Sequence, residues 1–173
     1  MFGSFGANDT ERVVQEYKNA IARIAFQYTK NWMDAEDVTQ DVIIRWLQKK
    51  PFFSTKGHEK AWFIRVTINI CKDRLRSMPN KANLLFDEAI STSYLSDTTT
   101  NVTNIEMLNV IFSLPEKYRI VVYLHYYERY TLNEIAAIYK KSPNTIQTWH
   151  ERAKKMLRKM IGDEDHELGN ISS

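Results

Sequence analysis

Apolar residues recur three or four positions apart along most of this chain, and that spacing limits the fold more than any other feature. Val13, Tyr17, Ile21 and Ile24, for example, follow one another at such intervals, which is the period of one helix face. No stretch shows the strict alternation of a half-buried strand. The pattern predicts an all-α protein with helices over 10–30, 34–50, 59–77, 105–114, 116–127, 131–139 and 142–161.

The helical period breaks off at Met78, where the composition changes. Residues 91–104 are rich in Ser, Thr and Asn and poor in large apolar side chains, which is typical of a flexible linker. We therefore expect two small helical domains on a tether. The predicted parts are a three-helix domain over 8–78, a linker over 79–104, a helix-turn-helix domain over 105–162 and a frayed acidic tail over 163–173.

The cysteine content and the length of the apolar runs indicate the cellular compartment of the protein. The one cysteine, Cys71, excludes a disulfide framework or a Cys-rich zinc site within the chain and fits a reducing compartment. The first residues lack the regions of a signal peptide. The longest apolar runs, such as 120–124, are too short to span a bilayer. These features predict a soluble, cytoplasmic protein.

The stretch NWMDAEDVTQDV crowds acidic and amide side chains into the start of the second helix. Carboxylates this dense can bind a metal, perform acid/base chemistry, cap a helix or dock on a basic partner. We interpret Asp34 as the N-cap, with Glu36 and Asp37 in the first turn, where the helix dipole favours negative charge. Gln40 and Asp41 lie beyond that turn, so capping does not explain them.

Positive charge gathers on one helix in each domain. Residues 60–76 hold five basic residues and one acid, and residues 140–160 hold seven basic residues and one acid. This distribution favours contact with phosphates; a solvated helix face is the alternative. In the second domain, Thr131 and Glu134 have the spacing of a capping box, and Ser142 precedes a longer helix. This is the pattern of a helix-turn-helix, whose second helix enters the major groove of DNA.

Together these motifs resemble those of the extracytoplasmic-function (ECF) sigma factors of bacterial RNA polymerase, in the sigma-70-like family. DAEDVTQDV (34–42) resembles sigma region 2.2, and AWFIRVTINICKDRLR (61–76) resembles regions 2.3 to 2.4. SLPEKYRIVVYLHYYERYTLNEIA (113–136) and SPNTIQTWHERAKKML (142–157) resemble region 4. The resemblance covers most of the chain outside the linker and the termini.

The resemblance implies an alternative sigma factor, which selects promoters and is not an enzyme, with no cofactor, metal or small-molecule substrate. Its implied partners are the β′ clamp helices and β flap of core polymerase, promoter DNA, and an anti-sigma factor, which in this family is often membrane-bound. Such a partner would hold the protein at the membrane. Region 2 would capture the −10 element and assist melting, and region 4 would read the −35 element.

Three groups of residues match the contact positions of the family. The implied polymerase-binding residues are Asp37, Gln40 and Asp41. The implied −10 residues, in the loop before the third helix and on that helix, are Lys56, Gly57, His58, Arg65, Asn69, Lys72 and Arg76. The implied −35 residues are Lys141, Thr145, Gln147, Thr148, Glu151, Arg152 and Lys155.

Some positions depart from the family pattern. Lys140 and Lys141 stand where most members have Gly and an apolar residue. A non-Gly residue in the left-handed conformation costs about 1 kcal/mol, so we expect a reshaped turn. Trp149 replaces a common Arg, and we expect it to pack against the apolar stripe. His150 occupies a usually apolar position, which predicts a partly buried structural histidine.

Two other functions fit parts of the sequence. A stand-alone helix-turn-helix regulator would need no polymerase, but it would leave the basic helix over 61–76 without a purpose. A carboxylate metalloenzyme would use Asp34, Asp37 and Asp41, which share a helix face. No His or second acidic pair clearly completes such a site.

Overall fold

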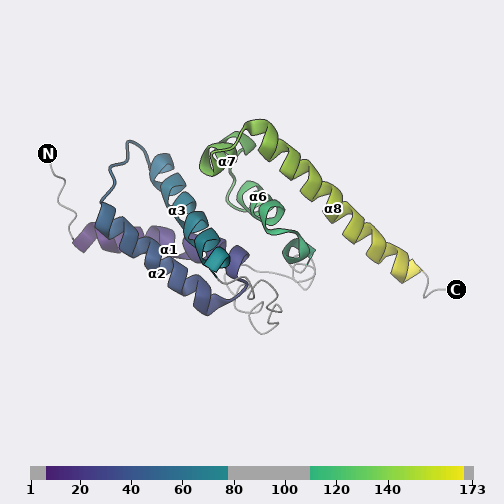
Figure 1. Ribbon diagram of the computed structural model, residues 1–173, viewed down its shortest axis with the longest axis horizontal. Coiled ribbons are helices and arrows are strands. Elements are labelled where there is room, and N and C mark those ends of the chain that lie inside the picture. The colour runs from purple at the N-terminus through teal and green to yellow at the C-terminus, as the bar shows by residue number, and fades with distance from the viewer. Residues whose placement is uncertain (1–6, 78–109, 170–173) are drawn as a thin grey trace. The chain divides into compact units, whose positions relative to one another are not determined.

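The chain folds as two compact units, 1–90 and 91–173 (Figure 1). The computed structural model describes residues 7–77 and 110–169, with side chains for 9–77 and 110–162. All elements in these ranges are helices, which confirms the predicted all-α fold. The predicted linker over 79–104 lies outside them. The helices are α1 (Ala7–Thr29), α2 (Trp32–Lys49), α3 (Lys56–Ser77), α6 (Glu116–Tyr126), α7 (Leu132–Tyr139) and α8 (Pro143–Gly169).

The first unit is a bundle of three helices, in which α1, α2 and α3 pack against one another in all three pairings. The predicted apolar stripes face inward, and Val38 and Val42 of α2 are fully buried. Trp46 and Phe63 fill the centre of the bundle, each 1% exposed, and Phe63 stacks on Tyr17 with ring centroids 4.6 Å apart. Burial of each such large apolar side chain stabilises the fold by about 1.5–3 kcal/mol.

α2 begins at Trp32, before the predicted start. Its N-cap is Asn31, whose Oδ1 accepts a hydrogen bond from the Asp34 amide at 3.1 Å, so the assignment of Asp34 as the N-cap is wrong. Trp32 stacks on Phe26 of α1 with ring centroids 4.7 Å apart, and this packing favours the earlier start. Asp34 still lies in the first turn, where the helix dipole favours a carboxylate.

α3 also begins earlier than predicted. It starts at Lys56, so Lys56, Gly57 and His58 form its first turn and do not lie in a loop. Thr55 caps this turn, because its Oγ1 accepts a hydrogen bond from the His58 amide at 3.1 Å. Gly57 does not use the conformational freedom of glycine. No described glycine has a positive φ, and a Cβ at Gly57 would meet only Thr55 Oγ1, at an ordinary 3.7 Å.

In the second unit, α6 packs against both helices of the helix-turn-helix, α7 and α8. The chain approaches α6 through helical residues 110–113. Arg119 of α6 is 3% exposed and donates hydrogen bonds from one guanidinium nitrogen to the carbonyls of Phe112 (2.9 Å) and Leu114 (3.1 Å). A buried cation therefore ties the segment before α6 to the helix, since its hydrogen bonds compensate part of the cost of its burial.

The caps of the helix-turn-helix agree with the sequence. Thr131 Oγ1 accepts a hydrogen bond from the Glu134 amide (3.2 Å), and Glu134 Oε2 accepts one from the Thr131 amide (2.8 Å), which confirms the capping box. The Thr131 hydroxyl and then the Thr131 amide donate hydrogen bonds to the Glu134 carboxylate, and these hold the pKa of Glu134 below its usual value. Ser142 Oγ accepts a hydrogen bond from the Thr145 amide at 3.2 Å, as expected for the cap of α8.

The turn between α7 and α8 keeps the left-handed geometry despite the missing glycine, so the expected reshaping is wrong. Lys140 has φ 52 and ψ 44, and its amide donates to carbonyls of the last turn of α7. Lys30, Lys50 and Arg129 are the other non-Gly residues with positive φ in the described ranges. All four are basic. A cation after a helix interacts favourably with the negative end of the helix dipole, which offsets part of the strain.

Replacing Lys140 by glycine is expected to raise the free energy of unfolding of the second unit by about 0.5–1 kcal/mol, because glycine adopts the left-handed conformation without strain. Urea denaturation followed by circular dichroism measures this change. Lys141→Gly is the matched control. Lys141 does not have a positive φ, so glycine there should give no gain. An equal gain at both positions would contradict the assignment of strain to Lys140.

α8 continues to Gly169, beyond the predicted end near Ile161, so the expected fraying of residues 163–169 is wrong. Gly162 does not stop the helix. A mid-helix glycine costs only about 1 kcal/mol, and Gly162 lacks the positive φ of a C-terminal cap. Within the part of the chain that the structure describes, no helix is long and apolar enough to cross a membrane.

Candidate polymerase and nucleic-acid interfaces

One face of α2 carries the predicted polymerase-binding residues. Asp37, Gln40 and Asp41 are all exposed, and Gln40 and Asp41 follow Asp37 by three and four positions, away from the buried face of the helix. Ile44 continues the same row and is 50% exposed, and Leu47 beside it is 39% exposed. We call Asp37, Gln40, Asp41 and Ile44 the α2 face. Ile44 and Leu47 together give this side of α2 a small exposed apolar area.

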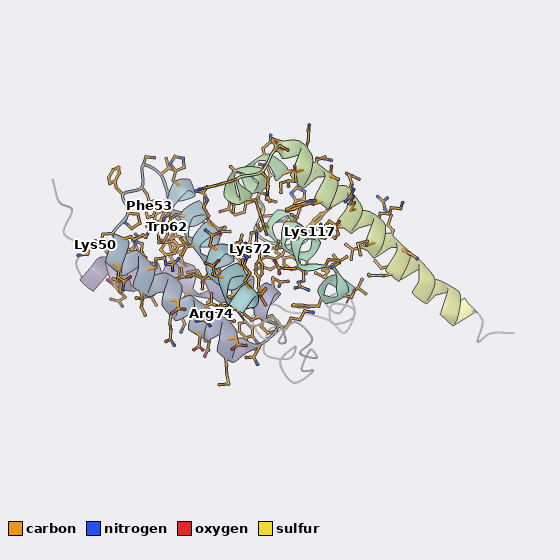
Figure 2. The ribbon with its side chains drawn as sticks, in the orientation of Figure 1. Lys50, Phe53, Trp62, Lys72, Arg74 and Lys117 are labelled. Carbon is orange, nitrogen blue, oxygen red and sulfur yellow. The ribbon has the colours of Figure 1, made fainter. Side chains whose placement is uncertain are left out.

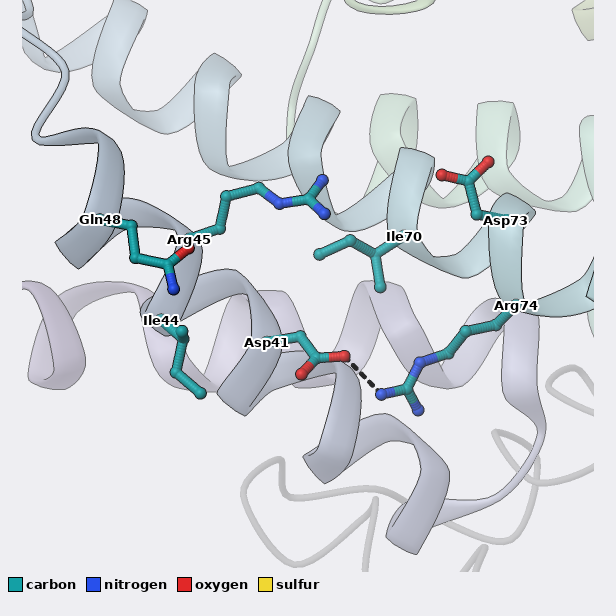
Figure 3. Close-up of a pocket in the computed structure, with 7 residues that line it drawn as sticks. All are labelled: Asp41, Ile44, Arg45, Gln48, Ile70, Asp73 and Arg74. Carbon is teal, nitrogen blue, oxygen red and sulfur yellow. Dashed lines mark hydrogen bonds and ion pairs between the residues drawn. The ribbon is translucent and has the colours of Figure 1, made fainter.

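A shallow groove of about 340 Å³ lies between α2 and α3 next to this face (Figure 3). Across this groove, Asp41 forms an ion pair with Arg74 of α3, with 2.5 Å between the carboxylate oxygen and the guanidinium nitrogen. Both side chains remain partly exposed, at 48% and 37%. Arg74 is one of the five basic residues over 60–76, and in the structure its side chain points toward α2. A cation on a partner would therefore compete with Arg74 for Asp41.

Most of the predicted −10 residues form one row on α3. Asn69 and Arg76 are exposed, whereas Arg65 and Lys72 are half-buried. Trp62 and Lys72 are labelled on α3 in Figure 2. Arg76 pairs with exposed Asp73 at 3.3 Å. Successive members lie three or four residues apart, so the α3 row shares one side of the helix. The α3 row consists of His58, Trp62, Arg65, Asn69, Lys72 and Arg76.

Aromatic side chains lie at the start of the α3 row. Phe53, in the loop before α3, meets Trp62 edge to face, with ring centroids 5.9 Å apart (Figure 2). Phe52 beside it is 94% exposed. His58 Nδ1 and Ser54 Oγ lie 2.7 Å apart, which links the loop to the helix. Phe52 is not among the −10 residues that the sequence predicted. Two adjacent phenylalanines in a polar loop were the signal that could have identified it.

Lys56 is not part of the α3 row. It lies on the opposite side of α3 and forms ion pairs with Glu16 of α1 (2.7 Å) and with Glu59 (3.1 Å). Glu59 is 6% exposed and also accepts hydrogen bonds from Arg12 (2.8 and 3.2 Å) and from the Tyr17 hydroxyl (2.8 Å). Lys56 therefore belongs to a network that attaches the start of α3 to α1.

This network shifts the pKa values of its members. Burial alone raises the pKa of Glu59, but hydrogen bonds from Arg12, Tyr17 and Lys56 outweigh it and bring the pKa to about 2. Burial and the Glu59 carboxylate raise the pKa of Tyr17. Glu59 is therefore ionised at neutral pH, although it lies inside the protein.

The exposed side of α8 carries the predicted −35 residues. Gln147, Thr148, Glu151 and Lys155 are exposed, and we call them the α8 row. Glu151 follows Gln147 and Thr148 by four and three positions, and Lys155 follows Glu151 by four. Gln147 Nε2 donates to Glu151 Oε1 at 3.2 Å, and Glu151 also pairs with Lys154 at 2.9 Å. The row can therefore present amide, hydroxyl and carboxylate groups to base edges, which is the chemistry of direct readout.

The remaining −35 residues lie beside the α8 row. Lys141, in the turn before α8, is exposed. The hydroxyl of half-buried Thr145 lies 2.8 Å from that of Ser142, at the cap of the helix. Arg152 is exposed next to Glu151 and lies near Tyr118 of α6, whose pKa it lowers.

Trp149 and His150 lie on the inner side of α8, as expected. Trp149 packs against the cluster of Leu114, Tyr118, Val122 and Ala153. His150 is 6% exposed, and its Nε2 lies 3.2 Å from the Tyr126 hydroxyl. Burial, followed by the nearby His125, lowers the pKa of His150. Both residues therefore support the packing of α8 and do not line the α8 row.

The acidic stretch of α2 is the metal site that the metalloenzyme alternative would need. Among the residues that the structure describes, no group of three His, Cys, Asp or Glu side chains is arranged to hold a metal ion. Asp41 pairs with a cation of the protein itself, Arg74.

Two family models match the chain. The model of sigma-70 region 2 matches residues 13–78, and the model of sigma-70 region 4 matches residues 105–157. Among curated proteins, the RNA polymerase sigma factor SigV of Bacillus subtilis is 29% identical over 153 residues, which cover 88% of this chain and 90% of SigV. The ECF RNA polymerase sigma factor SigW of the same species is 26% identical over 166 residues, or 87% of this chain and 88% of SigW.

Solved structures share the fold at low sequence identity. The sigma factor RpoE of Bartonella quintana, in complex with the anti-sigma factor NepR, has a TM-score of 0.71 and 18% identity, covering 90% of this chain and 98% of RpoE. CnrH, in complex with the cytosolic domain of CnrY, has a TM-score of 0.65 and 18% identity, covering 92% of each chain.

Proposed function

Because the chain belongs to the sigma-70 family, as an ECF sigma factor that directs RNA polymerase, we propose how its surfaces divide that work. The α2 face binds core polymerase, the α3 row with Phe52 binds the −10 element, and the α8 row binds the −35 element. The observation that carries this proposal is that each group of side chains lies along one side of one helix. The alternative of a stand-alone regulator is not favoured, because both sigma regions are present.

The composition of the α2 face supports docking on a basic partner with an apolar centre. Asp37 and Asp41 supply negative charge, and Ile44 supplies apolar area that is already exposed in the free protein. Burial of such an exposed side chain in an interface is favourable, by about 25 cal/mol per Å² of apolar area. The β′ clamp helices of core polymerase are the partner that we assign to this face, and the β flap is assigned to the second unit.

The start of the α3 row supports capture of an unstacked base. Extruding a base from the duplex costs a few kcal/mol, and stacking on an aromatic ring returns about 1–3 kcal/mol per base. Phe52, 94% exposed next to the Phe53–Trp62 pair, offers such a ring. Asn69 is exposed on the row and can hydrogen-bond to a base edge, while Arg65, Lys72 and Arg76 supply positive charge for phosphates. Lys56 is left out of this site because it pairs with Glu16 and Glu59.

Transcription with core polymerase over a promoter library tests the division. The wild-type protein should direct initiation from specific promoters. Phe52→Ala should lower open-complex formation by about tenfold, since the loss of one stacking contact costs about 1–3 kcal/mol. Asn69→Ala should change the preference among −10 sequences and leave the −35 preference intact. Lys56→Gln, which alters a residue outside the row, is the matched control.

The outcomes separate the parts of the proposal. Transcription that does not depend on the wild-type protein would exclude the sigma function. Promoter-dependent transcription that is unaffected by Phe52→Ala and Asn69→Ala would leave the function intact and exclude the −10 site.

We further propose that an anti-sigma factor regulates the protein, and that the protein acts in the cytoplasm by binding and not by catalysis. Support comes from RpoE and CnrH, two proteins of the same fold whose structures contain NepR and CnrY. An anti-sigma factor anchored in the membrane would hold the protein at the membrane. A pull-down from membrane and soluble fractions, followed by mass spectrometry, identifies such a partner.

A further inference from the structure

Two cations meet at one hydroxyl group on the second unit. Lys117, in the first turn of α6, and Arg152 of α8 both lie close enough to the Tyr118 hydroxyl to lower its pKa. The Lys117 ammonium lies over the Tyr118 ring, 5.0 Å from its centroid, and 5.8 Å from the centroid of the Trp149 ring. Figure 2 labels Lys117 at the start of α6. The packing of α6 against α8 therefore brings together two positive charges that lie far apart in the sequence.

Neither of these cations has a carboxylate partner among the described residues, although both are exposed. This differs from other basic side chains of the protein. Arg12 pairs with Glu16 and Glu59, Arg74 with Asp41, and Lys154 with Glu151. Two cations with a neutral hydroxyl between them leave an uncompensated positive charge, which favours an anion at this place.

The hydroxyl between the cations also has a proton to donate. A tyrosine hydroxyl accepts hydrogen bonds through its oxygen and donates one through its hydrogen. Lys117 and Arg152 can only donate, so neither of them takes up this proton. The hydrogen bond from Arg152, with the charge of Lys117, lowers the pKa of Tyr118. A lower pKa makes the hydroxyl a better donor to an anion.

The first turn of α6 carries Glu116 beside Lys117, so its side chains add no net charge, and only the helix end itself favours an anion. Its N-cap is Pro115, which makes no side-chain capping hydrogen bond. The N-terminus of a helix carries a partial positive charge and favours anions. Lys117 lies within this first turn.

We propose that Lys117, the Tyr118 hydroxyl and Arg152 together bind one phosphate group of the DNA backbone, at the edge of the duplex that the α8 row reads. This proposal rests on the proposed function of α8. Arg152 adjoins Glu151 of the α8 row, and backbone phosphates border the groove that a recognition helix enters. Two cations and one hydroxyl match the charge and the several acceptor oxygens of a phosphate.

The proposal changes the role of Arg152. If Arg152 binds a phosphate together with Lys117, it sets the affinity and register of the second unit and does not read a base. Its loss should weaken binding to all −35 sequences to the same degree. The base preference should then depend on Gln147 and Glu151 of the α8 row.

The test uses holoenzyme reconstituted with core polymerase, bound to labelled promoter duplexes over a range of KCl concentrations. Lys117→Gln and Arg152→Gln should each weaken binding by about tenfold and lower the slope of log K against log salt by about 1. Tyr118→Phe, which keeps the ring, should weaken binding without changing the slope. Lys18→Gln, which removes an exposed charge on α1, is the control and should match the wild type.

Single methylphosphonates, which are uncharged, identify the phosphate. One substitution in the −35 strand pair should weaken wild-type binding by about tenfold and have a smaller effect on Lys117→Gln, which has already lost one of the contacts to that phosphate. A wild-type salt slope for Lys117→Gln, or a changed ranking of −35 base variants for Arg152→Gln, would overturn the proposal. The proposal would also be overturned if every methylphosphonate weakened the binding of the wild type and of Lys117→Gln to the same degree.

Two further arms separate the possible anions and the underlying function. Inorganic phosphate that replaces chloride at constant ionic strength should not affect promoter binding. Competition by phosphate in the wild type, but not in Lys117→Gln, would assign the site to a free anion and overturn the DNA contact. If the wild-type holoenzyme showed no promoter preference, the proposed function of α8 would be excluded. The salt slopes do not test that function.

Discussion

Replacing Glu59 by alanine is expected to lower the free energy of unfolding of the first unit by about 1–3 kcal/mol, the usual cost of leaving a buried hydrogen-bonding group without its partner. Glu59 is 6% exposed and accepts hydrogen bonds from Arg12, Lys56 and Tyr17. Its removal leaves the Tyr17 hydroxyl and part of the Arg12 guanidinium without their acceptor inside the protein. The start of α3 would also lose its attachment to α1.

Thermal and urea unfolding of the full chain measure this loss. Glu16→Ala is the matched control, since Glu16 contacts the same two cations but its side chain is 40% exposed. An exposed ion pair contributes about 0–1 kcal/mol, so the control should change stability little. Equal effects of the two substitutions would show that burial does not govern the network.

The same network predicts an acid dependence. Because the pKa of Glu59 is lowered to about 2 in the folded protein, against about 4.3 in an unfolded chain, its stabilisation is complete above the unfolded value. It is lost as the pH falls from about 4 toward 2, where the unfolded state takes up the proton first. Glu59→Gln should therefore weaken the acid dependence of the first unit in this window.

Ile44→Arg is expected to weaken binding of the protein to core polymerase by at least 30-fold, which corresponds to a loss of about 2 kcal/mol or more at a central interface residue. The substitution removes apolar area and places a cation where the α2 face meets a basic partner. Ile44 is 50% exposed, so the fold should tolerate the change. Ile44 is a better probe than Asp41, whose substitution also breaks the ion pair with Arg74.

Fluorescence anisotropy of labelled protein titrated with core polymerase measures the affinity, and circular dichroism checks the fold. Ile161→Arg is the matched control, because Ile161 on α8 is a similarly exposed isoleucine, at 40%. The control should bind core with the affinity of the wild type. Wild-type affinity of Ile44→Arg would exclude the α2 face as the docking surface.

Helix positions and several caps could be predicted from the sequence because they depend on neighbours within one or two turns. The capping box of Thr131 and Glu134 and the cap at Ser142 were both correct. The start of α2 was not, because Asn31 and Asp34 are both good caps by local rules. The stacking of Trp32 on Phe26 of another helix favours the first of them.

The candidate sites divide in the same way. The α2 face, the α3 row and the α8 row follow from the helical period, and most of the predicted residues lie on them. Lys56 and Arg74 could not be placed, since each is one basic residue among several on α3. Their acidic partners, Glu16 on α1 and Asp41 on α2, lie far away in the sequence.

The sequence by itself determined that this protein is helical, that it has two helical modules and which side of each helix meets solvent, because the apolar period and the capping residues act over a few neighbouring positions. Only the tertiary structure decided which charges are compensated. Packing of α1 and α2 against α3 gives Lys56 and Arg74 carboxylate partners, and packing of α6 against α8 brings Lys117 and Arg152 to a shared hydroxyl. An ion pair depends on the distance between two side chains in space, which the spacing along the chain does not specify.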